Sequence, residues 1–372
     1  MKKQPSSIDL HYLVKELEIL KNSRIDKIYQ PEKDLIILSL YKTNVGKKLL
    51  RIDIGKAIFV VQEKEEYSKI LGFGELLRKH LDGYFLYDIE QLKPERILKL
   101  AFKAKEGQKH LYIEFFGKGN AILCDEHNVI INALEHHEFR ERVVKPKLKY
   151  VYPMMNNNLF DINKNQLEEL LKNSKKDSLV TCLAVELGLG GLYSEEVCLL
   201  SNVDKNTNPK NIEEKQIQLI SDNIKKIINH KIDAKVVFDE KNNVIDFTPF
   251  DFEFYSDKKY KKQKFNTFNE SISYFFSQFK EVKETEFDKK LRSLQRIIEE
   301  QKLAIEKLKK DEKELREKAE MIYHKYNLIK EILEEINKAS RKYSWKEIKE
   351  KLKGHKIIKE VNDKDRKVVV EI

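Results

Sequence analysis

A long heptad repeat toward the C-terminal end constrains the fold of this chain more than any other feature. From Leu291 to Ile336, alternating steps of three and four residues reach fourteen positions, twelve of them apolar; the exceptions are Gln301 and Glu312. Charged residues fill the positions between, so the pattern predicts a coiled-coil helix that begins near Phe287 and is roughly 75 Å long. The alternative is a helix of a globular bundle, although such helices are rarely so long.

The net charge of +10 is unevenly distributed over the 372 residues. Residues 281–340 carry 15 basic and 15 acidic side chains, so the predicted arm is neutral. The excess of lysine and arginine therefore belongs to the other parts of the chain. Such an excess on folded domains favours a polyanionic partner such as a nucleic acid.

Composition argues against several classes of protein. No stretch reaches the roughly 18 apolar residues of a membrane span, and polar residues follow the basic start MKKQPSS where a signal peptide would have its apolar core. The cysteines Cys124, Cys182 and Cys198 are far apart and form no CxxC pair, which disfavours zinc ribbons and disulfide frameworks. We therefore expect a cytoplasmic protein with reduced thiols and no membrane contact.

Strand-like runs dominate the first 160 residues. An amphipathic helix is predicted over 8–20, with Ser6 or Ser7 as its N-cap, and eight strand candidates follow, interrupted by a helix at 75–81. Short turns rich in Asp, Asn, Gly and Lys separate the strands, which is typical of an antiparallel sheet or sandwich. The predicted fold class is α+β.

The pattern turns helical after residue 160, with four helix candidates up to residue 229, two further strand runs and a helix at 268–279. After the arm, a short helix and a β-hairpin are predicted. The resulting domain prediction is 1–160 for a β-rich N-terminal domain, 161–282 for a helical module with strands, 283–340 for the coiled coil, and 341–372 for the start of a small α/β tip domain.

No motif for catalysis or metal binding stands out. The chain lacks P-loop, GxGxxG, GxSxG and HExxH patterns, and the adjacent His136 and His137 would point to opposite faces of a strand. The histidines near Cys124, which are His110 and His127, have no second cysteine in register. We expect no metal, no cofactor and no catalytic residues in this chain.

A glycine-rich segment, LAVELGLGGLYSEEVCLLS, resembles a helix-hairpin-helix motif. Gly188, Gly190 and Gly191 would let the backbone N–H groups of a helix N-terminus approach a phosphate closely. The alternative is a tight turn between two helices, which needs glycine only for its backbone conformation.

Two basic runs with aromatic neighbours are further candidates for phosphate contacts. Their members are Arg140, Arg142, Lys145, Lys147 and Lys149, followed by Tyr150, and Lys258, Lys259, Lys261, Lys262 and Lys264, with Tyr255, Tyr260 and Phe265. Lysine and arginine can neutralise phosphates and aromatic rings can stack on bases. In a lysine-rich chain, the alternative is an ordinary solvated surface.

The order of these motifs resembles the N-terminal and middle parts of the NFACT family, in its archaeal form. The resemblance rests on SSIDLHYLVKELE, GFGELLRKHLDG, QLKPERILKLAF, YIEFFGKGNAILCDEHNVIINALEHH, RVVKPKLKYVYP, the glycine-rich segment and the long coiled coil. It covers nearly the whole chain. The N-terminal domain and its helix-hairpin-helix also resemble formamidopyrimidine-DNA glycosylases.

The NFACT resemblance implies a factor of ribosome-associated quality control. Family members bind the large ribosomal subunit, through its rRNA, when it still carries an obstructed nascent peptidyl-tRNA. They recruit charged tRNA, typically alanyl-tRNA, for untemplated C-terminal tailing. Because the ribosome makes the peptide bonds, the resemblance implies that this protein is not an enzyme.

The resemblance also assigns tRNA handling to Asp9, Glu95 and Arg96. The family has an Asp-Arg pair where this chain has Glu95-Arg96, so the carboxylate is one methylene longer. Arg96 could grip a phosphate with two N–H groups, and Asp9 or Glu95 could accept a hydrogen bond from a ribose hydroxyl. The alternative is that Asp9 stabilises the N-terminus of its helix and that Glu95 and Arg96 form a surface ion pair.

Other functions fit the residues less well. A glycosylase of the resembling type needs a proline directly after the initiator methionine, whereas Lys2 and Lys3 stand there and Pro5 follows Gln4. Adhesion, which an older fibronectin-binding label for the family suggests, lacks an export signal. An RNA-binding scaffold without tailing activity remains the main alternative.

The heptad stripe needs a second helix that the sequence does not contain. The chain ends within the predicted tip domain, so we expect a piece of a longer protein. Its arm would then be single, or would dimerise with a second copy through the exposed seam.

Overall fold

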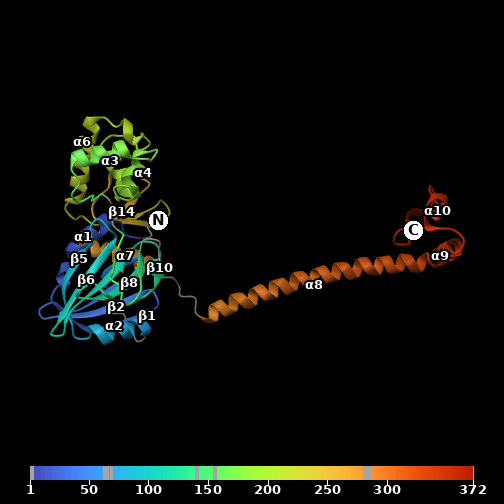
Figure 1. Cartoon of the computed structure of the whole chain (residues 1–372), viewed down its shortest axis with the longest axis horizontal. Helices are drawn as coiled ribbons and strands as arrows, with labels where there is room; N and C mark the ends of the chain where they lie inside the picture. The colour runs from blue at the N-terminus through green and yellow to red at the C-terminus, as the bar shows by residue number, and fades with distance from the viewer. Residues whose placement is uncertain are drawn as a thin grey trace. The chain divides into compact units, whose positions relative to one another are not determined.

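The computed structural model describes residues 4–61, 67, 70–138, 142–153, 157–279 and 286–371 (Figure 1). The chain divides into two compact units, Met1–Lys280 and Glu281–Ile372. The boundary predicted at residue 160 falls inside the first unit, because a single hydrophobic core contains residues from both sides of it.

Within the described residues, nine strands form one antiparallel sheet in the order β4-β3-β2-β1-β5-β6-β7-β8-β9. Their bounds are β1 Ser23–Glu32, β2 Leu35–Lys42, β3 Gly46–Asp53, β4 Ala57–Val61, β5 Phe85–Gln91, β6 Ile97–Ala104, β7 Gly107–Glu114, β8 Asn120–Asp125 and β9 Ile130–Ala133. The predicted α+β class with an antiparallel sheet is confirmed. Two very short strands, β10 His137–Glu138 and β11 Val143–Val144, pair separately.

The sheet is buried on both faces where β6 to β9 lie. In β7, Leu111 and Ile113 belong to the main core, whereas Tyr112 between them belongs to a second, smaller core. Helices α1 (Ser7–Leu17) and α7 (Phe268–Gln278) contribute to the main core. The segment around Val144 and Tyr150 covers the second core. Side chains that alternate between two buried faces explain why strands such as β8 are apolar almost throughout.

The sheet curls until two distant turns touch backbone to backbone. A Cβ atom added to Gly119, in the turn between β7 and β8, would lie 2.2 Å from the backbone nitrogen of Gly55, in the turn between β3 and β4. Both glycines have positive φ, +78° and +71°. Only glycine both adopts this backbone conformation readily and leaves room for the two backbones to approach so closely.

Helices cluster at one end of this sheet, as Figure 1 shows for α3, α4 and α6. The remaining elements of the first unit are η1 Glu18–Leu20, α2 Gly72–Leu81, α3 Lys164–Asn173, α4 Leu179–Val185, α5 Gly191–Leu200, η2 Pro209–Asn211, α6 Glu214–Ile228, β12 Lys235–Phe238, β13 Val244–Thr248, η3 Glu253–Tyr255 and β14 Lys261–Lys264. Strand β14, which pairs with β12, lies in a lysine run that the sequence did not predict as a strand.

The second unit contains the predicted arm and tip. Helix α8 spans Glu286–His324 and α9 spans Tyr326–Ser340, with a break at Lys325, where φ is −104° and ψ is 18°. The heptad side chains Leu294, Ile305 and Leu308 are 50%, 52% and 66% exposed. Coiled-coil pairing therefore stays a prediction.

The tip of this unit consists of α10 (Trp345–Lys351) and a hairpin of β15 (Ile358–Asn362) and β16 (Lys367–Val370). It packs against α9 through a small core that includes Ile336, Ile358 and Val361. In the part of the chain that is described, no helix is both long and apolar enough to cross a bilayer.

The contact between the two turns predicts that alanine substitutions at two neighbouring glycines lower the free energy of unfolding by very different amounts. Gly119→Ala should lower the free energy of unfolding by about 3 kcal/mol or more, because it adds a backbone clash to an unfavourable φ. Gly117→Ala is the matched control: its φ is +59°, but nothing lies within 4 Å of the added Cβ, so its cost should be about 1 kcal/mol. Urea denaturation measures both, and equal costs would contradict the close contact.

Candidate nucleic-acid interface

A cavity of about 470 Å³ lies where three segments of the first unit meet. These are the residues before and at the start of α1, the turn between β5 and β6, and the glycine loop between α4 and α5. The lining residues are Gln4, Pro5, Ser6, Ser7, Pro94, Glu95, Arg96, Phe116, Pro153, Ala184, Val185, Gly188, Leu189, Gly190, Gly191, Leu192 and Tyr193. The fold thus brings Glu95, Arg96 and the three predicted glycines to one place.

The N-terminus of α1 is fixed by a capping box. The Ser6 N–H donates to Asp9 Oδ2 at 2.7 Å, and the Asp9 N–H donates to Ser6 Oγ at 3.1 Å. The same carboxylate accepts a hydrogen bond from the Tyr193 hydroxyl at 2.9 Å, across 184 residues of sequence. Asp9 is completely buried. It joins α1 to α5 beneath the cavity, so the geometry supports a positioning role instead of direct tRNA contact.

Tyr193 stays a hydrogen-bond donor under all ordinary conditions. Burial raises the pKa of its hydroxyl well above the usual value, and the negative charge of Asp9 raises it further. The Tyr193 hydroxyl therefore keeps the proton that it donates to Asp9 in the neutral pH range.

The turn between β5 and β6 is tied to α1 by polar contacts. The Gln91 side-chain amide donates to the Ser7 carbonyl at 2.9 Å and to the Glu95 carbonyl at 3.1 Å. The Ser7 hydroxyl donates to the Pro94 carbonyl at 2.5 Å. These bonds hold the backbone that carries Arg96 in one position relative to α1.

Arg96 presents a cation at the cavity. Its Nη1 donates to the neutral side-chain oxygen of Gln4 at 3.3 Å, and Gln4 in turn donates to the Gly117 carbonyl at 3.0 Å. Burial lowers the pKa of the Arg96 guanidinium, while the nearby charge of Glu95 acts to raise it. An arginine stays charged after such a shift, and its planar fork suits a phosphate.

The glycine loop adds backbone donors to the same cavity. Gly188 and Gly190 have φ of +81° and +79°, which the turn itself requires. Gly190 is the N-cap of α5 and provides no side chain to cap its N–H groups. Gly191 is different: its φ is not positive, and a Cβ there would meet nothing within 4 Å. The open space before an uncapped helix N-terminus agrees with close approach of an anion.

Among the other predicted phosphate contacts, Arg142 is engaged by side chains of the protein itself. Arg142 donates two hydrogen bonds to Glu114, at 2.6 and 3.0 Å, and the Tyr150 hydroxyl donates to the same carboxylate at 2.9 Å. The side chains of Arg142 and Glu114 are only 9% and 3% exposed. A buried carboxylate thus occupies the guanidinium of Arg142, and these contacts do not support its phosphate contact, which stays a prediction. Arg140 lies outside the described residues.

The lysines on and before β14 mostly have partners of their own. Lys262 Nζ lies 2.5 Å from Asp251 Oδ1, Lys261 donates to the side chain of Asn242, and Lys259 pairs with Asp257 at 3.5 Å. Lys258 is exposed. These contacts agree with the alternative of a solvated surface, and nothing brings the lysines to the cavity.

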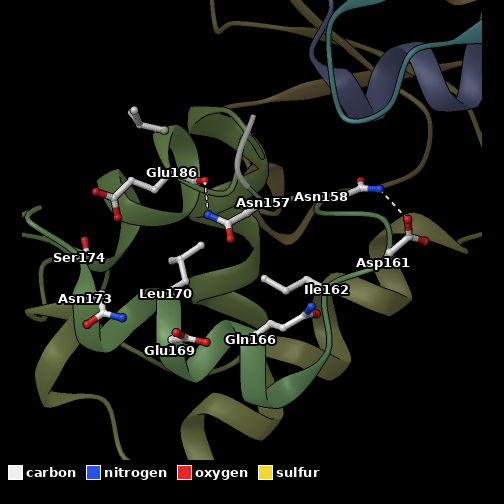
Figure 2. A pocket seen from close by; sticks show the side chains of 11 residues that line it. Asn157, Asn158, Asp161, Ile162, Gln166, Glu169, Leu170, Asn173, Ser174 and Glu186 are labelled. Atoms are coloured by element: carbon white, nitrogen blue, oxygen red, sulfur yellow. Dashed lines mark hydrogen bonds between the residues drawn. The ribbon is translucent and has the colours of Figure 1, made fainter. Parts of the chain in front are cut away.

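A larger cavity, of about 730 Å³, lies on the helical module beside the first one (Figure 2). Its lining is acidic and amidic: Asp161, Glu169 and Glu186 are joined by Asn157, Asn158, Gln166 and Asn173. Asn158 donates to Asp161 Oδ2 at 2.5 Å, and Asn157 to the Glu186 carbonyl at 3.3 Å. Three carboxylates and no lysine or arginine would repel a phosphate. In the described part of the chain, no His, Cys, Asp and Glu cluster has a metal-binding arrangement.

Sequence reasoning missed the residues that hold the cavity in shape. Gln4, Gln91 and Tyr193 make the contacts above, but none lies in a motif that would single it out. A capping box does have a signal, because Ser6 and Asp9 stand three residues apart before an apolar run. The partner across the chain, Tyr193, has no such signal.

Residues 6–366 of the chain match the family described as NFACT N-terminal and middle domains. The chain belongs to the NFACT family. A relative of this NFACT chain, the archaeal Rqc2 homolog aRqcH of Methanocaldococcus jannaschii, is 27% identical over 401 residues, covering all of this chain and 58% of the relative. The human ribosome quality control complex subunit NEMF is 27% identical over 232 residues, covering 59% of this chain and 21% of NEMF. This chain is thus considerably shorter than either relative.

Solved structures agree with the fold of this NFACT chain. The fibrinogen binding protein of Staphylococcus aureus has a TM-score of 0.62 at 19% identity, covering 73% of this chain and 98% of that protein. The N-terminal part of the fibronectin/fibrinogen-binding protein of Streptococcus suis has a TM-score of 0.58 at 22% identity, covering 73% and 99%. Thermus thermophilus MutM (FPG) reaches only 0.34 at 10% identity, covering 60% and 74%. The predicted glycosylase resemblance therefore stays a prediction.

The buried ion pair predicts that removal of Arg142 destabilises the protein without changing its affinity for RNA. Arg142→Met in this NFACT chain should lower the free energy of unfolding by about 3–5 kcal/mol, because Glu114 would remain charged and buried without its partner. The double variant Arg142→Met/Glu114→Leu should recover part of that loss. Urea denaturation tests the stability. A tRNA affinity that falls in folded Arg142→Met as it does in an Arg96 variant would contradict this assignment.

Proposed function

We propose that this NFACT protein binds tRNA at the Arg96 cavity as part of ribosome-associated quality control. The observation that carries the proposal is one cavity with two features suited to phosphate: the partly buried Arg96 guanidinium and the uncapped N-terminus of α5. The names of the relatives, which refer to the ribosome quality control complex and to Rqc2, support the biological setting.

In this proposal the protein positions tRNA and performs no reaction of its own. It binds the large ribosomal subunit carrying obstructed peptidyl-tRNA and recruits charged tRNA, of which alanyl-tRNA is the expected species, for untemplated C-terminal tailing. The ribosome supplies the peptidyl-transfer chemistry. Glu95, beside the guanidinium, accepts from a ribose hydroxyl or a base amino group, a contact that distinguishes RNA from a simple polyanion.

A second candidate is an RNA-binding scaffold without tailing activity. The observation that favours it is the division of the chain into two units, with the heptad side chains of α8 substantially exposed and so suited to contact with a partner. Co-sedimentation with purified large subunits, followed by sequencing of the bound RNA, separates the two functions. Enrichment of tRNA in the bound fraction supports the first; subunit binding without tRNA supports the scaffold.

The cavity predicts a specific loss of tRNA affinity. Arg96→Ala should weaken tRNA binding by about 10- to 100-fold, since a charge-assisted contact contributes about 1.5–3 kcal/mol. It should also reduce the slope of log affinity against log salt by about one. Arg96→Lys should retain part of the affinity, because it keeps the charge but loses the planar fork.

The matched control is Lys215→Ala, an exposed lysine of α6 that does not line the cavity. Filter binding or gel shifts across a salt series measure all three variants. Wild-type affinity and salt slope in Arg96→Ala would refute the proposed site.

A further inference from the structure

A further group of basic side chains lies near the same turn, around the ring of Phe160. Lys93, in the turn between β5 and β6, has its Nζ 4.7 Å from the Phe160 ring centroid. The His11 ring, from α1, lies 4.9 Å from that ring. One turn further along α1, Lys15 Nζ lies 4.9 Å from the ring centroid of Tyr12. Two lysines and a histidine therefore converge over two aromatic rings.

Lys15 and Lys93 influence each other electrostatically, and neither forms an ion pair with a carboxylate in the described part of the chain. Burial lowers the pKa of Lys15, and the charge of Lys93 lowers it further. Burial also lowers the pKa of His11 to about 4, and the charges of Lys15 and Lys93 contribute to that shift. The adjacent acid on α1, Glu16, accepts the backbone N–H groups of Phe268 and Asn269 instead.

Elsewhere on this unit, lysines pair with acids. Lys164 lies 2.7 Å from Glu214, and Lys205 lies 3.0 Å from Glu195. No such pair involves Lys15 or Lys93 within the described ranges of the chain. Like charges held together cost free energy that a bound anion would recover.

The group is continuous with the Arg96 cavity. Lys93 and Arg96 belong to one turn, and His11 follows Asp9 on α1. The hydrogen bond from Ser7 to Pro94 fixes the helix against that turn. A chain of phosphates that follows this turn and α1 would therefore meet both Arg96 and the two lysines.

We propose that Lys15 and Lys93, with His11 and Phe160 between them, bind a second backbone phosphate of the RNA whose neighbouring segment occupies the Arg96 cavity. The proposal rests on the function proposed above and adds the direction in which the RNA backbone leaves the cavity. Lysines act here as point charges, so the site contributes affinity without reading sequence.

The test compares Lys15→Gln, Lys93→Gln and their double variant with wild type, using tRNA binding across a salt series. Each single variant should weaken binding several-fold, and the double variant should reduce the salt slope by about one, as expected for one lost phosphate contact. Lys215→Gln is the control and should change neither quantity. Both lysines are exposed, so the variants should fold, which thermal melts verify.

A second readout is the pKa of His11, followed by NMR with and without tRNA. A phosphate beside Lys15 and Lys93 would offset their charge, so the pKa should rise from about 4 when tRNA binds. An unchanged His11 pKa on binding would overturn the proposed second phosphate site.

Arg96→Ala, measured in parallel, separates the two proposals. If Arg96→Ala weakens binding while both lysine variants bind as wild type, the second phosphate site is wrong and the proposed function stands. If neither Arg96→Ala nor the lysine variants alter binding, both are wrong. A loss in Lys215→Gln as large as in the lysine variants would show a general charge effect and would also overturn the inference.

Discussion

The arrangement of the candidate site depends on one buried carboxylate. Asp9 accepts the Ser6 N–H, which closes the first turn of α1, and the Tyr193 hydroxyl, which comes from α5. Because Asp9 has no exposure to solvent, both hydrogen bonds form in a medium of low dielectric, where an unpaired carboxylate would be costly. The N-terminal segment and the glycine loop therefore form two walls of a cavity that neither could form alone. Neutral substitution of Asp9 would loosen both walls at once.

The sheet supplies the rigidity that this arrangement needs. The turn that carries Arg96 leads into β6, a strand with a core on each face, and the Gln91 amide ties it to α1. Buried Glu114, paired with Arg142, lies at the end of β7, two residues before Phe116 of the cavity wall. An arginine that holds a phosphate needs a backbone that does not move, since misplacement by 1 Å removes much of a charge-assisted contact. The hydrogen bonds that Gln91 and Ser7 donate, together with the Arg142–Glu114 pair, meet that need.

Much of this fold follows from short-range patterns, and the site follows only in part. Alternating apolar residues predict the strands, and Ser6 or Ser7 as an N-cap before an apolar run predicts the start of α1, because each signal lies within a few residues. The sequence also points to Arg96 and to the glycine loop. It does not show that Arg142 is neutralised by Glu114, 28 residues away, since pairing across the sheet depends on its register. For the same reason, the sequence does not show that Tyr193 is the hydrogen-bond partner of Asp9. Charge is visible in a sequence, whereas its neutralisation is a property of the fold.

The charges around the site also define an orientation for a bound polyanion. Val185 lines both cavities, so it stands between the Arg96 side and the acidic side with Asp161, Glu169 and Glu186. A phosphate chain is attracted to the first side and repelled by the second. In the proposed arrangement the RNA backbone leaves the Arg96 cavity toward Lys15 and Lys93, which form no ion pair with a carboxylate among the described residues. In such a site a few phosphate contacts provide the affinity. Repulsion from the neighbouring acidic cavity sets the direction of the bound backbone.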